Sequence, residues 1–507
     1  MIAEIHTITL AGIHAQTIQI QVQIAPGIAS FNIVGLPDSS VKESRDRIRG
    51  AFHALGIALP AKRITVSLSP ADIHKEGNHF DLPIAIGLLK VLKIVPHDHI
   101  PQSLFLGELG LDGSIRGIVG ALPAAIHAKT KKFENLFLPQ ANGNEASWVE
   151  GVAVYPCNHL KELMHHLQNK IRLTTAQTPE VNAPKSPENQ LDFSDVRGQE
   201  FAKRAAEIAA AGGHNMLMCG TPGSGKSMIA KRMVGIMPSL SSQEILDISM
   251  IHSIAGLLPD HGIVHQKPFR EPHHTASAVA LCGGGLKAKP GEMSLAHGGV
   301  LFLDELPEFP RQVLETLRQP LETGEITVSR ANHHVTYPAN FQFIAAMNPS
   351  PCGYLGHPSI PCTSTPKQIQ NYRNKLSGPL LDRIDLHVDV APVSIEDMQL
   401  PPAKENSAAI KKRVDQAYTL QAQRYKQASI SKNSQLYGAL LDQYCPLNAD
   451  CITLMQKASE KYAMSARGYH RILRVARTIA DLAGAQNIAK PHISEALMYR
   501  YIPYKPL

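Results

Sequence analysis

The first residues of the chain, MIAEIHTITLAGIHAQTIQI, alternate apolar and polar positions. This alternation predicts a strand, because successive side chains of a strand point to opposite faces of a sheet. Strands are predicted at residues 5–10, 17–24, 64–68, 104–106 and 136–138. Residues 39–55 carry a helical pattern. Together these patterns predict an α/β or α+β domain over residues 1–172.

The second half of the chain has apolar strands and helical periodicity of its own. Residues 215–219 form a short apolar run that precedes a helical stretch at residues 228–237. Further apolar strands are predicted at residues 300–303 and 341–347. The helix predicted at residues 465–482 has an apolar stripe that consists of Ile472, Val475, Ile479 and Leu482. The pattern predicts an α/β core that ends in a helical domain.

A proline-rich stretch, TTAQTPEVNAPKSPENQ, separates these halves. It has little apolar content and no periodicity, as expected for a linker. The sequence therefore predicts four segments: residues 1–172, a linker at 173–190, an α/β core at 191–400 and a helical region at 401–507.

The amino-acid composition indicates which class of protein this chain belongs to. The 507 residues are 44% hydrophobic and 18% charged, which is typical of a globular chain. No run approaches 18 apolar residues, and the N-terminus lacks the basic start of a signal peptide. Seven cysteines, an odd number, fit a reducing compartment better than a disulfide framework. We therefore expect a cytoplasmic protein with no membrane partner.

The net charge is +7, and the basic excess lies entirely in residues 401–507. Two interpretations remain open. The basic segment can face nucleic acid, or it can bring arginines to a nucleotide.

Residues 220–227 read GTPGSGKS, a complete G-x-x-x-x-G-K-[ST] phosphate loop between a strand and a helix. Its glycines allow positive φ angles, so that backbone N–H groups turn inward towards phosphate. Lys226 supplies a charge to the β and γ phosphates, and Ser227 offers its hydroxyl to Mg²⁺. The predicted nucleotide-binding residues are Gly220, Thr221, Pro222, Gly223, Ser224, Gly225, Lys226 and Ser227.

The strand at residues 300–303 ends in Asp304 and Glu305. Asp304 is placed to hold Mg²⁺, and Glu305 to polarise an attacking water. The alternative is that both acids only cap the following helix. Asn348 ends another buried strand and is suited to hold the water or the γ-phosphate. These residues predict hydrolysis of a nucleoside triphosphate, with ATP and Mg²⁺ as cofactors.

Residues 269–309 and the segment SGPLLDRIDL at 377–386 closely resemble the magnesium-chelatase-like AAA+ ATPases, and within them the ComM competence-protein family. The resemblance covers nearly the whole chain. It implies an AAA+ phosphate-loop ATPase core with a C-terminal helical lid. It also implies that Asn348 is sensor 1, Arg467 is sensor 2, and Arg383 is an arginine finger that reaches a neighbouring subunit. The active form would then be a homohexameric ring.

Residues 75–89 and 107–129 resemble the catalytic domain of Lon proteases, which uses a serine–lysine dyad. On that pattern the serine position falls at His79 and the lysine position at Leu122. Leucine cannot act as a base. We therefore expect an inactive Lon-protease-like domain that serves ring assembly or DNA handling.

The family commonly has paired cysteines after the sensor asparagine, with the look of a four-thiolate zinc site. Here two of the four positions are serines: the four residues are Ser350, Cys352, Cys362 and Ser364. His357 supplies at most a third ligand, whereas structural zinc takes four N or S donors. We expect no zinc.

Two loops are candidates to contact DNA in the pore of the ring. One carries Lys287 and Lys289, and the other is a hairpin at residues 326–338 with Arg330 and His333 near its turn. The resemblance implies an ATP-driven DNA helicase that promotes branch migration and integration of single-stranded DNA during natural transformation. Its implied partners are single-stranded, branched and recombinase-coated DNA. Two alternatives remain: a magnesium-chelatase-type motor that remodels a protein, and an ATP-dependent Lon-like protease.

Overall fold

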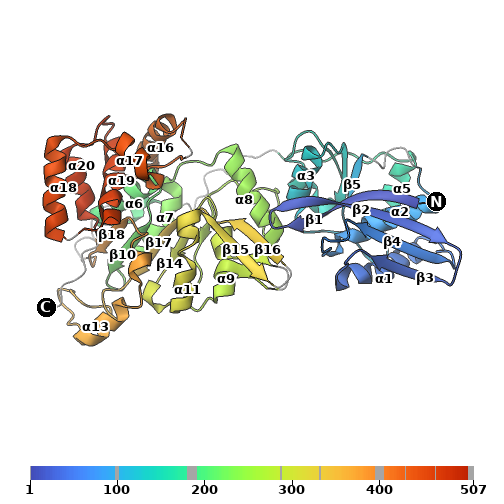
Figure 1. The fold of residues 1–507 in the computed structure, drawn as a ribbon, viewed down its shortest axis with the longest axis horizontal. Helices are drawn as coiled ribbons and strands as arrows, with labels where there is room; N and C mark the ends of the chain where they lie inside the picture. Colours follow the sequence, from blue (N-terminus) through green and yellow to red (C-terminus); the bar gives the residue numbers. More distant parts are fainter. Residues whose placement is uncertain are drawn as a thin grey trace. The chain divides into compact units, whose positions relative to one another are not determined.

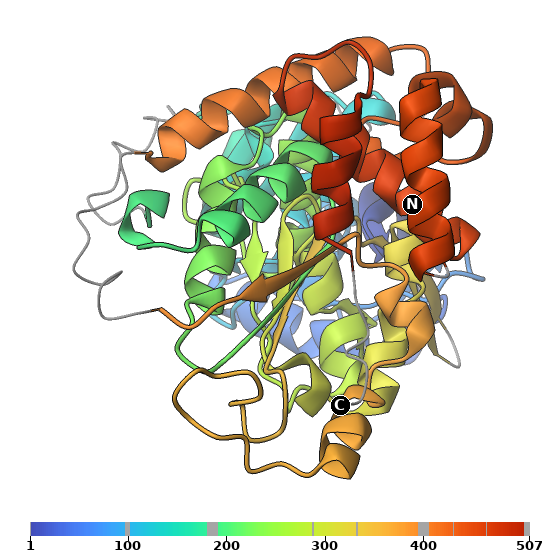
Figure 2. The ribbon, with the colours of Figure 1, turned by 90° about the vertical axis from the view of Figure 1, so that its left-hand side faces the viewer.

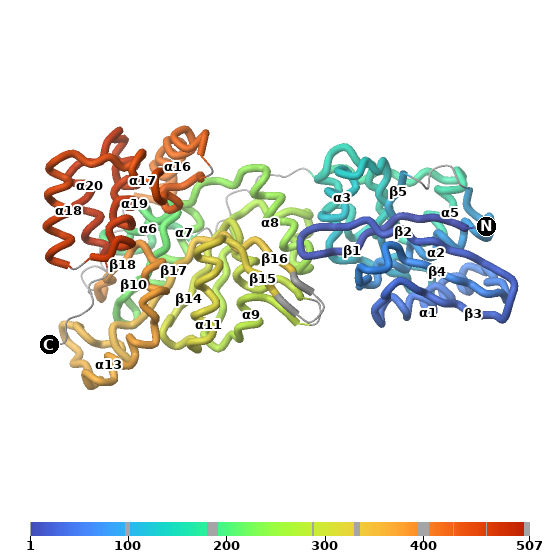
Figure 3. Tube along the Cα trace, viewed as in Figure 1, coloured from blue at the N-terminus to red at the C-terminus, as the bar shows by residue number. Residues whose placement is uncertain are grey.

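A computed structural model of the chain describes residues 2–96, 102–179, 191–285, 288–330, 333–393, 405–428, 430–462 and 464–500 (Figure 3). The chain divides into two compact units. Unit 1 comprises residues 1–184 together with 242–265, and unit 2 comprises residues 185–241 and 266–507. Within the described ranges, no helix is both long enough and apolar enough to span a bilayer.

Unit 1 is built on a mixed sheet of seven strands in the order β3-β4-β2-β1-β5-β8-β9. These strands are β1 (Ile2–Ala11), β2 (His14–Ala25), β3 (Ser30–Val34), β4 (Arg63–Ser69), β5 (Ser103–Phe105), β8 (Asn135–Pro139) and β9 (Ala153–Cys157). A small hairpin pairs β6 (Glu108–Leu109) with β7 (Ile115–Arg116). The alternation seen at the N-terminus is the long antiparallel pair β1–β2, which buries Ile5, Ile18 and Ile20.

Helices cover this sheet with apolar faces. They are α1 (Ser39–Ala54), α2 (Asp81–Val91), α3 (Ala121–Thr130), α4 (Gly143–Ala146) and α5 (Leu160–Leu167). Helix α2 is buried along nearly its whole length and packs against β1 and β2. The predicted α+β domain is therefore present, with strands and helices in two layers.

One further helix of unit 1, α8 (Ser242–Ala255), comes from far along the chain. The sequence placed residues 242–265 inside the ATPase core, but the structure groups them with the N-terminal unit. The buried carboxylate of Glu145 explains the docking, because it accepts hydrogen bonds from Leu122 N and from the Ser253 hydroxyl. Trp148 Nε1 also donates to the His261 carbonyl at 3.0 Å. A segment that follows the phosphate-loop helix in sequence is thus packed on α3.

Unit 2 contains a parallel sheet of five strands in the order β11-β14-β17-β10-β18 (Figure 1). The strands are β10 (Met216–Gly220), β11 (Phe269–Arg270), β14 (Val300–Leu303), β17 (Gln342–Met347) and β18 (Leu386–Val390). Their residues are almost all buried, as expected of parallel strands with helices on both faces. Helices α6 (Glu200–Gly212) and α7 (Lys226–Ile236) flank β10 in the chain.

Shorter elements complete the core of unit 2. The helices are α9 (Ala278–Cys282), α10 (Glu292–Leu295), α11 (Arg311–Thr316), α12 (Pro320–Thr323), α13 (Pro366–Arg373) and α14 (Gly378–Leu381). Two hairpins are present: β12 (Gly283–Gly284) with β13 (Lys289–Pro290), and β15 (Glu325–Arg330) with β16 (His333–Pro338).

The C-terminal residues form a helical lid, which Figure 2 shows in orange and red beside the sheet. Its helices are α16 (Ser407–Arg424), α17 (Gly438–Tyr444), α18 (Ala449–Tyr462), α19 (Ala466–Leu482) and α20 (Lys490–Met498). Helices α16 and α19 pack against α6. The α/β core with a C-terminal helical lid, as predicted from the sequence, is confirmed.

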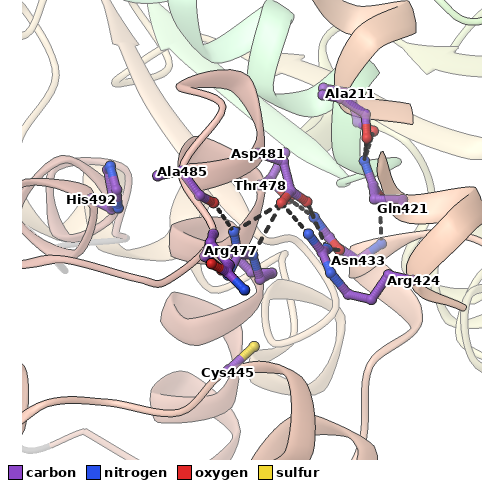
Figure 4. A network of polar contacts seen from close by, with 12 residues as sticks. Ala211, Gln421, Arg424, Asn433, Cys445, Arg477, Thr478, Asp481, Ala485 and His492 are labelled. Atoms are coloured by element: carbon purple, nitrogen blue, oxygen red, sulfur yellow. Dashed lines mark hydrogen bonds and ion pairs between the residues drawn. The ribbon is translucent and has the colours of Figure 1, made fainter. Parts of the chain in front are cut away.

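A buried polar network fastens the lid internally (Figure 4). The Asp481 carboxylate, fully inside the lid, accepts from Arg424 at 2.5 Å, from Arg477 at 2.9 Å and from Asn433 at 2.9 Å. Asn433 also donates to the Thr478 hydroxyl, which bonds to His214 Nε2 at 2.7 Å. Because His214 follows α6, this network connects the lid to the ATPase core. Two arginines of the basic C-terminal region, Arg424 and Arg477, are therefore paired with a carboxylate inside the fold.

Candidate nucleotide-binding and hydrolysis site

The phosphate loop lies between β10 and α7, at the carboxyl edge of the parallel sheet. Gly223 and Gly225 have φ angles of 78° and 92°, and a Cβ atom placed on either would meet nothing within 4 Å. The concave side of the loop is therefore open. The Thr221 hydroxyl is buried without a hydrogen-bond partner among the described atoms. An open cradle of backbone donors with an unsatisfied hydroxyl fits a bound phosphate chain.

Lys226 begins α7 and turns its ammonium group back into the loop. Nζ donates to the carbonyl oxygens of Gly220 at 2.8 Å and Thr221 at 2.9 Å, and lies 3.5 Å from Asn348 Oδ1. Burial lowers the pKa of Lys226, while Asp304 acts in the opposite direction. Asn348 stands at the end of β17, which pairs directly with β10. The structure thus brings the predicted sensor amide and the loop lysine together.

Ser227 and Asp304 meet across the same edge of the sheet. Ser227 Oγ donates to Asp304 Oδ2 at 2.7 Å, and the other carboxylate oxygen accepts from Glu305 N at 2.8 Å. A hydroxyl and a carboxylate at this separation are oxygen donors of the kind that Mg²⁺ takes beside a phosphate chain. The residues therefore fit the predicted Mg²⁺.

Glu305 has a left-handed backbone, with φ 52° and ψ 44°. Such a conformation is costly for a residue with a Cβ and is found most often at functional sites. His274 Nδ1 lies 3.3 Å from Glu305 Oε2, although half of the glutamate side chain is exposed. This contact was not among the predictions from the sequence. No local spacing reveals it, because residues 274 and 305 belong to different segments.

Arg383 lies at the opposite edge of the sheet. It precedes β18, and its carbonyl accepts a 2.9 Å hydrogen bond from Asn215, which precedes β10. Because β10 spans five residues at about 3.3 Å each, the two edges are separated by about 13 Å. The guanidinium donates to the Pro379 carbonyl at 2.7 Å and to Glu322 Oε2 at 2.5 Å. It therefore points away from the phosphate loop of its own chain.

Arg467 lies with Arg383 and apart from its own chain's phosphate loop. Both arginines line a cavity of about 750 Å³, together with Arg474, Glu322 and Asp385. Arg467 is exposed at the start of α19, and its charge contributes to lowering the pKa of Glu322 after the larger effect of Arg383. The structure thus divides the predicted catalytic residues into two groups at opposite edges of the sheet.

A buried carboxylate forms the floor of this arginine group. Asp385 Oδ1 accepts from Arg474 at 3.3 Å, and Oδ2 lies 3.2 Å from His214 Nδ1. Burial alone raises the pKa of Asp385, but Arg474 and His214 outweigh this and hold the pKa at about 2. Asp385 therefore stays ionised and holds Arg474 of α19.

Comparisons with known proteins identify the family of the chain. Three models of magnesium chelatase match the chain: subunit ChlI of Mg-chelatase at residues 20–142, magnesium chelatase subunit ChlI at 192–398, and its C-terminal part at 404–500. The Competence protein ComM of Haemophilus influenzae is 44% identical, over 96% of this chain and 95% of that protein. The chain belongs to the ComM family of magnesium-chelatase-like AAA+ ATPases.

More distant relatives extend the family. YifB of Escherichia coli is 41% identical over 98% of this chain and 97% of its own length. The 38 kDa magnesium-chelatase subunit of Rhodobacter capsulatus is 24% identical over 59% of this chain and 84% of that subunit. The resemblance predicted from the motifs is confirmed, and the family implies ATP and Mg²⁺ use by this chain.

The two predicted DNA loops lie side by side. Lys289 is exposed in β13, and Lys287 is outside the described residues. Arg330 and His333 pair in register at the end of the β15–β16 hairpin that adjoins residues 331–332, although their side chains are outside the description. The Tyr337 hydroxyl donates to the Ala288 carbonyl at 2.9 Å and so ties the hairpin to the neighbouring loop.

The positions of the Lon-type dyad hold no catalytic pair. His79 is buried and its Nε2 donates to the Ile8 carbonyl at 2.8 Å. Burial lowers the pKa of His79 to about 4, so the ring is neutral near pH 7. Leu122 belongs to a hydrophobic cluster. The serine and the lysine of that protease are therefore both replaced in this chain.

Proposed function

We propose that this chain is an ATP-driven, hexameric DNA motor that acts in the cytoplasm. It promotes branch migration and the integration of single-stranded or recombinase-coated DNA during natural transformation. The proposal rests on the position of Arg383. This residue lies at the opposite edge of the sheet from the phosphate loop of its own chain. A second subunit is then required to complete each nucleotide site.

Residues at the carboxyl edge act on the nucleotide. Backbone N–H groups of residues 220–225 and Lys226 Nζ bind the phosphate chain, for which Lys226 exchanges its carbonyl partners for phosphate oxygens. Ser227 and Asp304 would hold Mg²⁺, which would supply positive charge to the phosphate chain. Glu305 accepts a proton from the attacking water, and Asn348 orients that water.

The arginine group serves a neighbouring subunit. Arg383 and Arg467 face one cavity, so a phosphate presented by the next subunit would meet two cations. An arginine supplied in this way stabilises the charge that develops on the transferred phosphoryl group and contributes about 10³ to 10⁵ in rate. Head-to-tail repetition of one interface generates a ring when the rotation closes. The hexamer is the ring that the family resemblance implies.

The DNA assignment is supported by the relative named Competence protein ComM and by the paired loops. Lys289 is an exposed cation on the hairpin β12–β13, which is tied to the β15–β16 hairpin through Tyr337. Cations on such loops contact phosphates without reading base edges, as a translocating motor requires. Arg330, His333 and Lys287 extend this set in sequence.

A magnesium-chelatase-type motor that remodels a protein partner is the second candidate, because relatives include magnesium-chelatase subunits. The same loops would then grip protein. A Lon-like protease is not proposed, since His79 and Leu122 occupy the dyad positions.

The deciding experiment measures ATP hydrolysis with single-stranded, branched and no DNA, together with strand displacement on branched DNA. We expect DNA to raise turnover severalfold, and displacement to be lost in Lys226→Ala. Lys289→Ala should weaken the stimulation, whereas Lys457→Ala, an exposed lysine of α18, serves as a matched control and should not. If no DNA stimulated hydrolysis, the protein-remodelling function would replace the DNA motor.

A further inference from the structure

The loop between β17 and α13 gathers the two cysteines that follow the sensor strand. Cys352 Sγ lies 3.2 Å from Cys362 Sγ, although the two residues are ten positions apart. Two serines surround them: Ser350 Oγ is 3.2 Å from Cys352 Sγ, and Ser364 Oγ accepts from Cys352 N at 3.1 Å. The four positions that the family fills with cysteines thus converge in space, with two thiols and two hydroxyls.

The hydrogen bonds in this cluster point towards Cys352. Ser350 Oγ accepts from Leu355 N at 3.3 Å and from the Cys362 thiol at 3.8 Å, which leaves its own proton to be donated to Cys352. Hydrogen bonds from Ser350, Ser364 and the backbone of Tyr354 lower the pKa of Cys352 to about 5. Cys352 is therefore a thiolate at neutral pH, with a second thiol in contact with it.

The other cysteines offer a contrast. Burial raises the pKa of each thiol in this group: Cys157, Cys219, Cys282, Cys445 and Cys451. Among the seven cysteines, all of which are described, Cys352 combines a lowered pKa with a neighbouring thiol.

The donor set of the cluster favours a bond between the two sulfurs over a shared zinc. Structural zinc takes four N or S donors, whereas only two of the four side chains here are thiols. The two sulfurs already lie 3.2 Å apart. Among the described residues, no cluster of three or more His, Cys, Asp and Glu side chains with metal-binding geometry is present.

We propose that Cys352 and Cys362 are an oxidisable dithiol whose reversible disulfide slows ATP turnover at the adjoining phosphate loop. The oxidant is a peroxide. The Cys352 thiolate attacks one peroxide oxygen and breaks the O–O bond, giving a sulfenic acid and hydroxide. The Cys362 thiol then attacks the Cys352 sulfur, the S–O bond of the sulfenic acid breaks, and the sulfenic hydroxyl leaves as water with the thiol proton. Overall, two thiols and hydrogen peroxide give one disulfide and two waters.

The loop that carries the two cysteines contacts the phosphate loop through Gly353, the residue after Cys352. Gly353 packs so closely on the phosphate loop that a Cβ atom there would lie 2.8 Å from Pro222 Cδ. The loop begins immediately after Asn348, and the Pro349 carbonyl accepts from Arg373 at 3.1 Å. Bond formation draws the sulfurs together to about 2.05 Å. The loop is then fixed between the sensor strand and Pro222.

The test treats full-length, reduced protein with hydrogen peroxide and measures its intact mass, its disulfide-linked peptides and its basal ATP turnover without DNA. We expect a loss of two hydrogens, located to a 352–362 crosslink, and turnover lowered on the order of threefold. Dithiothreitol should reverse both changes. Alkylation of the reduced protein at pH 6.5 should modify Cys352 about tenfold faster than the other cysteines.

Cys352→Ser and Cys362→Ser should each abolish the crosslink and the effect of peroxide on turnover. The matched control is Cys282→Ser, a partly buried thiol at the last residue of α9, which should keep both. The crosslink is read by mass and is independent of the proposed function, whereas its effect on turnover rests on the proposed ATP hydrolysis.

The proposal is overturned if the crosslink joins other cysteines or two chains, or does not form. It is equally overturned if the protein holds one zinc per chain that must be removed before oxidation. A crosslink that leaves turnover unchanged would refute the coupling to the phosphate loop.

Discussion

The two edges of the parallel sheet in unit 2 differ in how their charged side chains are satisfied. At the carboxyl edge, Lys226 is held by carbonyls of its own loop, and Ser227 by Asp304. At the opposite edge, Arg383 and Arg467 line an open cavity and are balanced by the exposed Glu322. The first group is suited to hold a phosphate chain, whereas the second group presents cations to an open cavity. The difference indicates two complementary half-sites on one chain.

The largest expected effects come from removing one cation at each edge. Lys226→Ala should abolish both nucleotide binding and turnover, because its ammonium contacts the phosphates in the ground state and the transition state. Arg383→Ala should lower turnover by about 10³ or more while leaving binding nearly unchanged. Fluorescent-nucleotide binding and steady-state hydrolysis measure the two properties. Equal loss of binding in both variants would contradict the division into half-sites.

Mixing these two variants tests whether the half-sites meet between subunits. An interface is complete where the loop of an Arg383→Ala subunit faces the arginine of a Lys226→Ala subunit. Random equimolar assembly places about one quarter of interfaces in that arrangement, so a corresponding part of the wild-type turnover should return. Each variant alone, at the same total concentration, is the control. No recovery in rings that demonstrably exchange subunits would show that each chain completes its own site.

Much of the carboxyl half-site could be predicted from the sequence, because its motifs are local. Asp304 and Asn348 each end a buried strand, and neighbouring parallel strands end at one edge. The edge at which Arg383 lies was not predictable, since it depends on the pairing of β18 with β10. The contact of His274 with Glu305 and the docking of residues 242–265 on unit 1 also depend on tertiary packing.

A smaller effect is expected at Asp385, which lies beneath the arginine half-site. It is measured as a change in the free energy of unfolding. Asp385→Asn should lower the free energy of unfolding by about 2 to 3 kcal/mol at pH 7, because Arg474 and His214 lose a buried anion. The folded-state pKa is below the unfolded value of 3.8, so the carboxylate stabilises above about pH 4. That contribution declines as the pH falls towards 2.

Parallel urea unfolding at pH 7 and pH 3 checks this prediction. The gap between wild type and Asp385→Asn should narrow at the lower pH. The matched control is Asp382→Asn, whose more exposed carboxylate lies 3.3 Å from Arg471 and should contribute at most about 1 kcal/mol. A gap that widened on acidification would mean that Asp385 is protonated in the folded protein.

The smallest effect is expected at Glu322, which holds Arg383 in the isolated chain. The Glu322 side chain is 63% exposed, and such surface pairs contribute about 1 kcal/mol or less. Arg383 must leave this carboxylate to reach a neighbour's phosphate, so Glu322→Gln should raise turnover by about two- to fivefold, and less at high salt. Glu315→Gln, which breaks a similar exposed pair with Arg318, is the control and should have no effect. A fall in turnover would instead show that Glu322 aims Arg383 across the interface, and the arginine half-site would then be built before the neighbour arrives.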